Sequence, residues 1–88
     1  MTREEFNDLH ESLCYGHDAE LFINETHYFL EWNITEIEVY IVADGKGERI
    51  CSFSGSDRFE TVDLLFAASI NGKTLNESFS EIQIVDIE

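Results

Sequence analysis

The sequence predicts an α+β fold in which an antiparallel sheet of four to five strands carries its helices on one face, in the order α-β-β-β-β-α-α-β. Apolar residues recur at helical spacing within the first 16 residues. Residues 19–53 hold short runs rich in aromatic and β-branched residues, separated by turn signals, and the helical period returns after residue 57. Strands gathered in one stretch, with helices before and after it, are typical of α+β domains.

The first helix is predicted from its start signal and its apolar stripe. Thr2 and Glu5 form a T-x-x-E capping box, which satisfies the free amides at a helix N-terminus. The stripe that follows consists of Phe6, Leu9 and Leu13. Gly16 then stands where a C-terminal cap is expected. One short amphipathic helix needs a sheet on which to bury this stripe.

Four strands follow as a predicted meander over residues 19–24, 27–33, 36–43 and 49–53. The third alternates between apolar and polar residues, which is the pattern of a strand with one buried face. The turn at residues 44–47 reads Asp-Gly-Lys-Gly, and glycine there supplies positive φ without steric cost. Trp32 falls on the predicted inner face of the second strand, and we expect it to be buried between sheet and helices.

The second half returns to helical spacing. Asp57 and Glu60 make a helix start, and Asn71-Gly72 is the predicted stop. The expected apolar side of this helix consists of Phe59, Val62, Leu65, Phe66 and Ser69. Thr74 and Glu77 repeat the capping box before a second short helix. Residues 83–87 alternate and predict a last strand at the edge of the sheet.

The composition of the chain says more about its possible binding partners than about any catalytic activity. With 88 residues the chain makes a single domain, residues 1–88, and 43% hydrophobic residues place it among folded proteins. The net charge of -14 repels nucleic acid and anionic membranes, so direct nucleic-acid or membrane binding is not expected. Residues 1–44 carry 11 of the 19 acidic residues and one base. A protein with a basic surface is the partner that this charge favours.

The start of the sequence and its cysteines predict a cytoplasmic protein. Acidic residues stand where a signal peptide needs a basic and then an apolar region, and no apolar run is long enough to span a membrane. Two cysteines, Cys14 and Cys51, are too few for a disulfide scaffold and are expected to be reduced thiols.

No motif in the sequence predicts an enzyme, a metal or a cofactor. His10, Cys14 and His17 have roughly helical spacing, but Gly16 breaks the helix before His17 and no further cysteine–histidine pair completes four zinc ligands. Gly72-Lys73-Thr74 lacks the first glycine of a phosphate-binding loop, because position 67 is alanine. No motif in the sequence combines a nucleophile with a general base at the spacing of a known catalytic site.

The outer face of the sheet is the candidate binding surface. If the apolar alternate residues face the helices, period two fixes which residues face away from them. The predicted partner-binding residues on that side are Glu20, Phe22, Phe29, Glu31, Glu36, Glu38 and Tyr40. The same counting places His27, Val42, Cys51 and Phe53 there. An aromatic centre with a charged rim is typical of a protein-binding surface. The alternative is that the C-terminal segment covers this face.

The last third of the chain resembles a pattern in small acidic proteins of Gram-positive bacteria. The residues that carry the resemblance are 57–65 (DRFETVDLL), 71–75 (NGKTL) and 82–87 (IQIVDI). Phages and mobile elements of these bacteria encode many such proteins, including anti-CRISPR proteins, some of which mimic nucleic acid. The resemblance implies a small partner-binding protein of a mobile element, and it carries over no functional residue.

Two functions from different classes follow. The first is a stoichiometric inhibitor or modulator, anti-CRISPR-like, that acts as a nucleic-acid mimic and occupies a basic groove of its partner. The second is a structural or adaptor module that forms a homodimer through its aromatic sheet face and has no inhibitory role. The concentration of acidic residues over the strands favours the first function.

Overall fold

A computed structural model describes all 88 residues. Its helices are α1 (Arg3–Cys14), α2 (Arg58–Ala67) and α3 (Leu75–Ser78), with a 3-10 turn at Phe79–Glu81. Its strands are β1 (Ala19–Ile23), β2 (Thr26–Asn33), β3 (Glu36–Ala43), β4 (Lys46–Phe53), β5 (Ser69–Ile70), β6 (Lys73–Thr74) and β7 (Ile82–Ile87).

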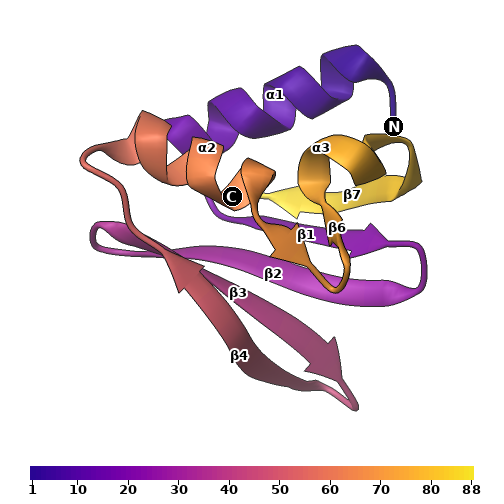
Figure 1. The fold of residues 1–88 in the computed structure, drawn as a ribbon. Coiled ribbons are helices and arrows are strands. Elements are labelled where there is room, and N and C mark those ends of the chain that lie inside the picture. Colours follow the sequence, from indigo (N-terminus) through magenta and orange to yellow (C-terminus); the bar gives the residue numbers. More distant parts are fainter.

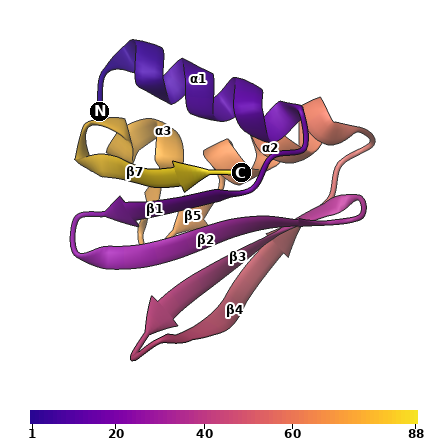
Figure 2. The ribbon, with the colours of Figure 1, turned by 180° about the vertical axis from the view of Figure 1, so that it is seen from behind.

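Five of the strands form one antiparallel sheet in the order β4-β3-β2-β1-β7. The helices all lie on one side of this sheet, as both views show (Figures 1 and 2). The predicted α+β class, element order and one-sided helical layer are therefore confirmed. The last strand pairs with β1, so it extends the sheet at its edge and does not cross the open side.

Both ends of α1 have the local structures that the sequence predicts. The Thr2 side chain accepts a hydrogen bond from the Glu5 amide, and the Glu5 carboxylate accepts one from the Thr2 amide. Gly16 has φ +92°. Its amide donates to the Leu13 carbonyl, and the His17 amide donates to the Ser12 carbonyl. This paired arrangement is a Schellman motif, which needs the left-handed conformation that glycine adopts readily.

The core lies between the sheet and the helices. It consists of 16 buried apolar residues, among them Leu9 of α1, Leu30 of β2 and Leu65 of α2, which are almost fully inaccessible to solvent. Trp32 packs against this core on the inner side of β2 and its Nε1 donates to the Leu13 carbonyl at 2.9 Å. The expected position between sheet and helices is therefore confirmed, but the side chain is half-buried and not buried.

The fourth strand begins at Lys46, inside the turn expected at residues 44–47, and the second half of the chain differs from the expectation in two further places. The helix α2 ends at Ala67, and the residues expected to continue it form the short β5–β6 hairpin around Asn71-Gly72. Both turn residues have positive φ, which favours a tight hairpin over a helix. Phe59, expected on the apolar side of α2, is 61% exposed, so this expectation is wrong. Phe59 lies in the first turn of α2 and is not part of the core. The apolar residues of α2 that belong to the core come later in the helix, and they are Val62, Leu65 and Phe66.

Candidate functional site

The side of the five-stranded sheet that faces away from the helices carries all seven predicted binding residues. The strand register places Glu20, Phe29, Tyr40 and Arg49 in one row across four strands. We call this side the open face. Its residues include Glu20, Phe22, His27, Phe29, Glu31, Glu36, Glu38, Tyr40, Val42, Arg49, Gln83 and Asp86. No helix or loop of the chain covers it (Figures 1 and 2).

Cys51 and Phe53 do not belong to the open face, and their assignment to it is wrong. Cys51 lies opposite Val39 and Phe53 lies opposite Ile37, both of which point into the core. A β-bulge opposite Val39 and Tyr40 inserts one extra residue, Ile50, into β4. A bulge shifts the alternation by one, so strict counting by two fails beyond it.

The centre of the open face is a half-buried aromatic group. The His27 ring stacks on Phe22 with ring centroids 4.5 Å apart, and it lies at a tilt to Phe29 with a centroid distance of 5.4 Å. His27 Nε2 is 2.6 Å from a Glu20 carboxylate oxygen. Two of the predicted aromatic residues and one of the predicted glutamates therefore form a single packed unit with a histidine.

Glu38 has its negative charge compensated within the chain. Arg49 Nη1 donates to one carboxylate oxygen at 2.7 Å, and the Tyr40 hydroxyl donates to the other at 3.1 Å. The hydrogen bond from Arg49 lowers the pKa of Glu38, and the bond to Glu38 raises the pKa of Tyr40. The Glu38 side chain is also largely buried, at 9% exposure. This carboxylate is consequently ionised but is not free to bind a partner's cation.

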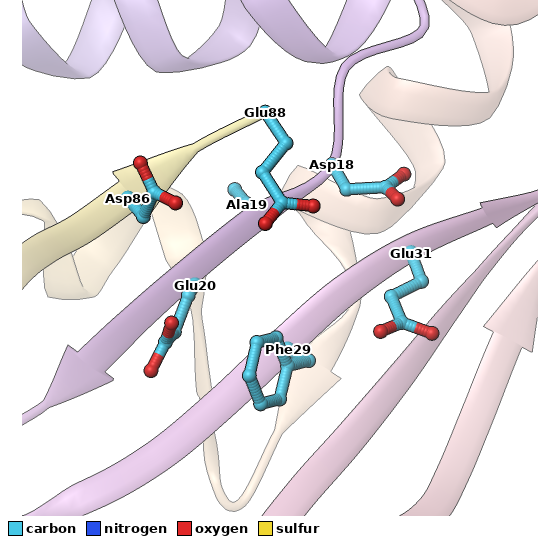
Figure 3. A pocket seen from close by; sticks show the side chains of 7 residues that line it. All are labelled: Asp18, Ala19, Glu20, Phe29, Glu31, Asp86 and Glu88. Atoms are coloured by element: carbon cyan, nitrogen blue, oxygen red, sulfur yellow. The ribbon is translucent and has the colours of Figure 1, made fainter.

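The uncompensated charge lies at the other end of the open face, beside β7. A hollow of about 140 Å³ opens there, and the side chains around it are Asp18, Ala19, Glu20, Phe29, Glu31, Asp86 and Glu88. Figure 3 shows the carboxylates arranged around the space next to the Phe29 ring. None of the five basic residues lines it. We call this feature the acidic hollow.

The pKa of Glu31 is shifted by its surroundings in the acidic hollow. Its pKa is raised, first because the side chain is partly desolvated and then because Asp18, Glu38 and Glu88 place negative charge near it. Glu31 also lies directly opposite Glu38 on the neighbouring strand. Like charges facing each other across a strand pair are destabilising unless a counter-charge is present. Arg49 provides that counter-charge to Glu38 alone.

Sequence reasoning missed Arg49, Asp18, Asp86 and Glu88 as parts of this surface. Arg49 is at the start of the predicted fourth strand, where counting by two already puts it on the open face, but no local signal in the sequence indicates that it pairs with Glu38. The other three are brought together by the pairing of β7 with β1, where Glu88 and Asp18 exchange backbone hydrogen bonds of 2.9 and 3.3 Å. The alternation of residues 83–87 indicates a strand, but no local signal in the sequence shows that this strand pairs with β1.

The histidines and cysteine that resemble zinc ligands do not converge on one site. His10 lies between Cys14, with Nδ1 3.7 Å from Sγ, and Asp63, with Nε2 2.8 Å from the carboxylate. His17 Nδ1 is 2.7 Å from the Glu88 carbonyl oxygen. Burial, followed by nearby acidic residues, raises the pKa of the Cys14 thiol, which disfavours the thiolate form needed of a nucleophile or zinc ligand.

Comparison of the chain with protein-family models, curated proteins and solved structures finds no match. None of the three helices combines the length and the apolar character needed to cross a bilayer. The features of the chain that indicate a function are thus the geometry and the charge of the open face.

Proposed function

We propose that this chain is a small acidic protein-binding protein that docks a basic surface of its partner on the open face. The observation that carries the proposal is that an uncovered sheet face combines half-buried aromatic side chains with an acidic hollow that holds no basic residue. Protein-binding surfaces commonly pair an apolar centre with a polar rim. The mode of action we propose is stoichiometric inhibition or modulation of the partner.

The paired and unpaired carboxylates define which end of the open face the partner's cations occupy. Glu38 and Glu20 already have Arg49 and His27 as neighbours. The other four acids of the acidic hollow have no ion-pair partner in the chain: Asp18, Glu31, Asp86 and Glu88. A partner's lysine and arginine side chains gain most where no internal cation competes, so we place them beside Phe29 and Glu31. The aromatic unit around His27 then supplies the contact that salt does not screen.

Nucleic-acid mimicry is the form of inhibition that this charge distribution favours. Carboxylates on neighbouring strands are spaced by about 5 Å across a sheet and about 7 Å along it. Phosphates along a nucleic-acid strand have comparable spacing, so the same lysines and arginines of a partner can bind either ligand. An anti-CRISPR-like protein of a mobile element, as the resemblance of the last third implies, is one protein of this kind.

Association of two copies through the open face is disfavoured by the same charges. A face-to-face homodimer brings the carboxylates of one acidic hollow close to those of the other, with no cation in either. Repulsion of like charges at an interface selects against such pairing. The open face therefore suits a basic partner better than a second copy.

The experiment that tests the proposal compares two variants that each lose three negative charges. One variant carries Glu31→Gln, Glu36→Gln and Asp86→Asn on the open face. The matched control carries Glu4→Gln, Asp8→Asn and Glu11→Gln on the exposed side of α1. Immobilised wild-type chain and each variant are used to capture proteins from a bacterial lysate at low and at high salt.

The expected result is that the wild-type chain and the α1 control capture the same basic protein, which duplex DNA displaces and high salt releases. The open-face variant loses that protein. If the α1 control loses it equally, the interaction depends on total charge and the open face is not the binding site. A captured protein that duplex DNA does not displace contradicts nucleic-acid mimicry.

A further inference from the structure

A second hollow, of about 300 Å³, lies on the helical side of the sheet, away from the open face. Residues of the β1–β2 turn, the β5–β6 hairpin, α3 and the 3-10 turn line it. Figures 1 and 2 show the β5–β6 hairpin on the same side of the sheet as the helices. Tyr28 of β2 also lines this hollow, whereas its neighbours His27 and Phe29 belong to the open face. The sheet therefore separates the two sites.

Two nearly buried residues with hydroxyl groups line this hollow. Tyr28 and Ser78 are each 2% exposed. Neither hydroxyl makes a hydrogen bond within the chain. No side-chain oxygen that is sealed from solvent lacks a partner, however. Both hydroxyls therefore keep a contact with solvent, and the hollow that the two residues share is the place for it.

The fold itself does not require the Tyr28 hydroxyl. Phenylalanine would occupy the same place in the core, between Leu21 of β1 and Ile41 of β3, without a polar group at the bottom of a hollow. Burial of a hydroxyl that has no partner costs free energy, and a ligand that supplies the partner recovers it. Polar groups held in this way within a concave and partly apolar site are typical of a ligand-binding pocket.

Hydrogen bonds to Glu81 hold the rim of this hollow in place. Its carboxylate oxygens accept from Asn24 Nδ2 at 3.1 Å and from Lys73 Nζ at 3.3 Å, and its carbonyl accepts from the Asn24 amide at 3.2 Å. These bonds connect the β1–β2 turn to the β5–β6 hairpin, so the hollow is formed before any ligand binds. They also pair the two charged side chains that line it, Lys73 and Glu81, with each other.

We propose that this hollow, which we call the hydroxyl pocket, binds a small uncharged ligand rich in hydroxyl groups, of the class of monosaccharides and related polyols. A hydroxyl both donates and accepts hydrogen bonds, so Tyr28 and Ser78 match ligand hydroxyls in either direction. The carboxamide of Asn71, at the rim, adds a donor and an acceptor. Ile23 and Ile70 provide an apolar wall for the C–H groups of the ligand.

The charges at the rim disfavour an ionic ligand in the hydroxyl pocket. An anion meets a lysine that Glu81 already neutralises, on a chain with a net charge of -14. A cation meets carboxylate oxygens that both already accept hydrogen bonds, with the Lys73 ammonium beside them. An uncharged ligand has neither disadvantage. Because the ligand is small, we expect weak binding, with a Kd on the order of 1 mM.

The test is a titration of the isotope-labelled chain with D-glucose, D-galactose, D-ribose and myo-inositol, followed by the chemical shifts of its amides. At least one compound is expected to move the signals of Asn24, Asn71 and Ser78 in a saturable way. Tyr28→Phe and Ser78→Ala should each weaken that binding about fivefold, since each removes one hydrogen bond. The matched controls are Tyr40→Phe, on the open face, and Ser80→Ala, on the exposed side of the 3-10 turn, and both should bind as the wild type does.

The Tyr28→Phe variant separates lost binding from lost folding, because removal of an unpartnered hydroxyl should leave the unfolding temperature unchanged or raise it. The proposal is overturned if no compound gives saturable shifts up to about 50 mM, well above the expected Kd. It is also overturned if Tyr28→Phe and Ser78→Ala bind as tightly as the wild type. Tighter binding of D-glucose 6-phosphate than of D-glucose would show an anion site instead. The measurement uses no other protein and does not involve the open face, so its outcome is independent of the proposed function.

Discussion

Two glutamates that face each other across β2 and β3 show how strongly single residues differ on one surface. Glu38 is held by Arg49 and Tyr40, and its pKa is lowered. Glu31, directly opposite, is partly desolvated among other acids, and its pKa is raised. The same side chain on the same face therefore stabilises the fold in one case and destabilises it in the other, because only one of the two has a cation beside it.

Arg49→Met is expected to lower the free energy of unfolding at neutral pH. In the wild type, Glu38 releases its proton more readily in the folded chain than in the unfolded chain, so its contribution is present above the ordinary glutamate pKa of about 4.5 and is lost as pH falls through the folded pKa. Urea denaturation at neutral and acid pH should show the deficit of Arg49→Met shrinking toward low pH. Lys46→Met, which removes an exposed charge from the same strand, should show no such trend. An Arg49→Met deficit independent of pH would mean that packing of the arginine, and not the ion pair, stabilises the sheet.

Glu31→Gln is expected to have the opposite effect. Because the folded chain raises the pKa of Glu31, its favourable contribution is present below the ordinary glutamate pKa and is lost as pH rises through the folded value. Replacing it with glutamine should raise the free energy of unfolding at neutral pH and change it little at acid pH. Glu25→Gln, in the exposed β1–β2 turn, is the control. A Glu31→Gln variant that is less stable than the wild type at neutral pH contradicts this account of the acidic hollow.

At the scale of elements, the helices are held to the sheet mainly by burial of apolar side chains. Leu9 of α1 has no accessible surface and belongs to the core cluster. Leu9→Ala removes buried methyl groups and leaves a cavity, which should cost about 2–5 kcal/mol in the free energy of unfolding. Leu64→Ala, on the exposed side of α2, should change it by no more than about 0.5 kcal/mol. Chemical denaturation of both variants measures the difference, and equal losses would show that α1 does not depend on this contact.

The elements that sequence predicted correctly are those with local causes. The capping boxes at Thr2 and Thr74, the stop at Gly16 and the alternation along β3 depend on residues a few positions apart. The bulge at Ile50 and the pairing of β7 with β1 depend on contacts between distant segments. For this reason the sequence places the seven predicted binding residues together on the open face, as the structure does, but it misplaces Cys51 and Phe53 and misses the acids contributed by β7.

At the scale of the whole molecule, net charge acts on folding and on binding in opposite directions. A chain with 19 acidic and five basic residues repels itself when compact, and salt screens that repulsion over about 10 Å at 0.1 M. Added sodium chloride should therefore raise the stability of the fold. The same screening should weaken attachment of a basic partner to the open face.

The acidic hollow should be the main source of the stabilising effect of salt, because its five carboxylates are close together and four of them have no ion-pair partner in the chain. Glu31→Gln with Asp86→Asn should therefore flatten the dependence of the unfolding temperature on sodium chloride. Glu4→Gln with Asp8→Asn removes the same charge from the exposed side of α1 and should leave that dependence nearly unchanged. Thermal unfolding of the wild type and both variants across a salt series measures the slopes. Equal slopes for the two variants would show that the repulsion is spread over the whole surface, and the open face would then have no special electrostatic role in the fold.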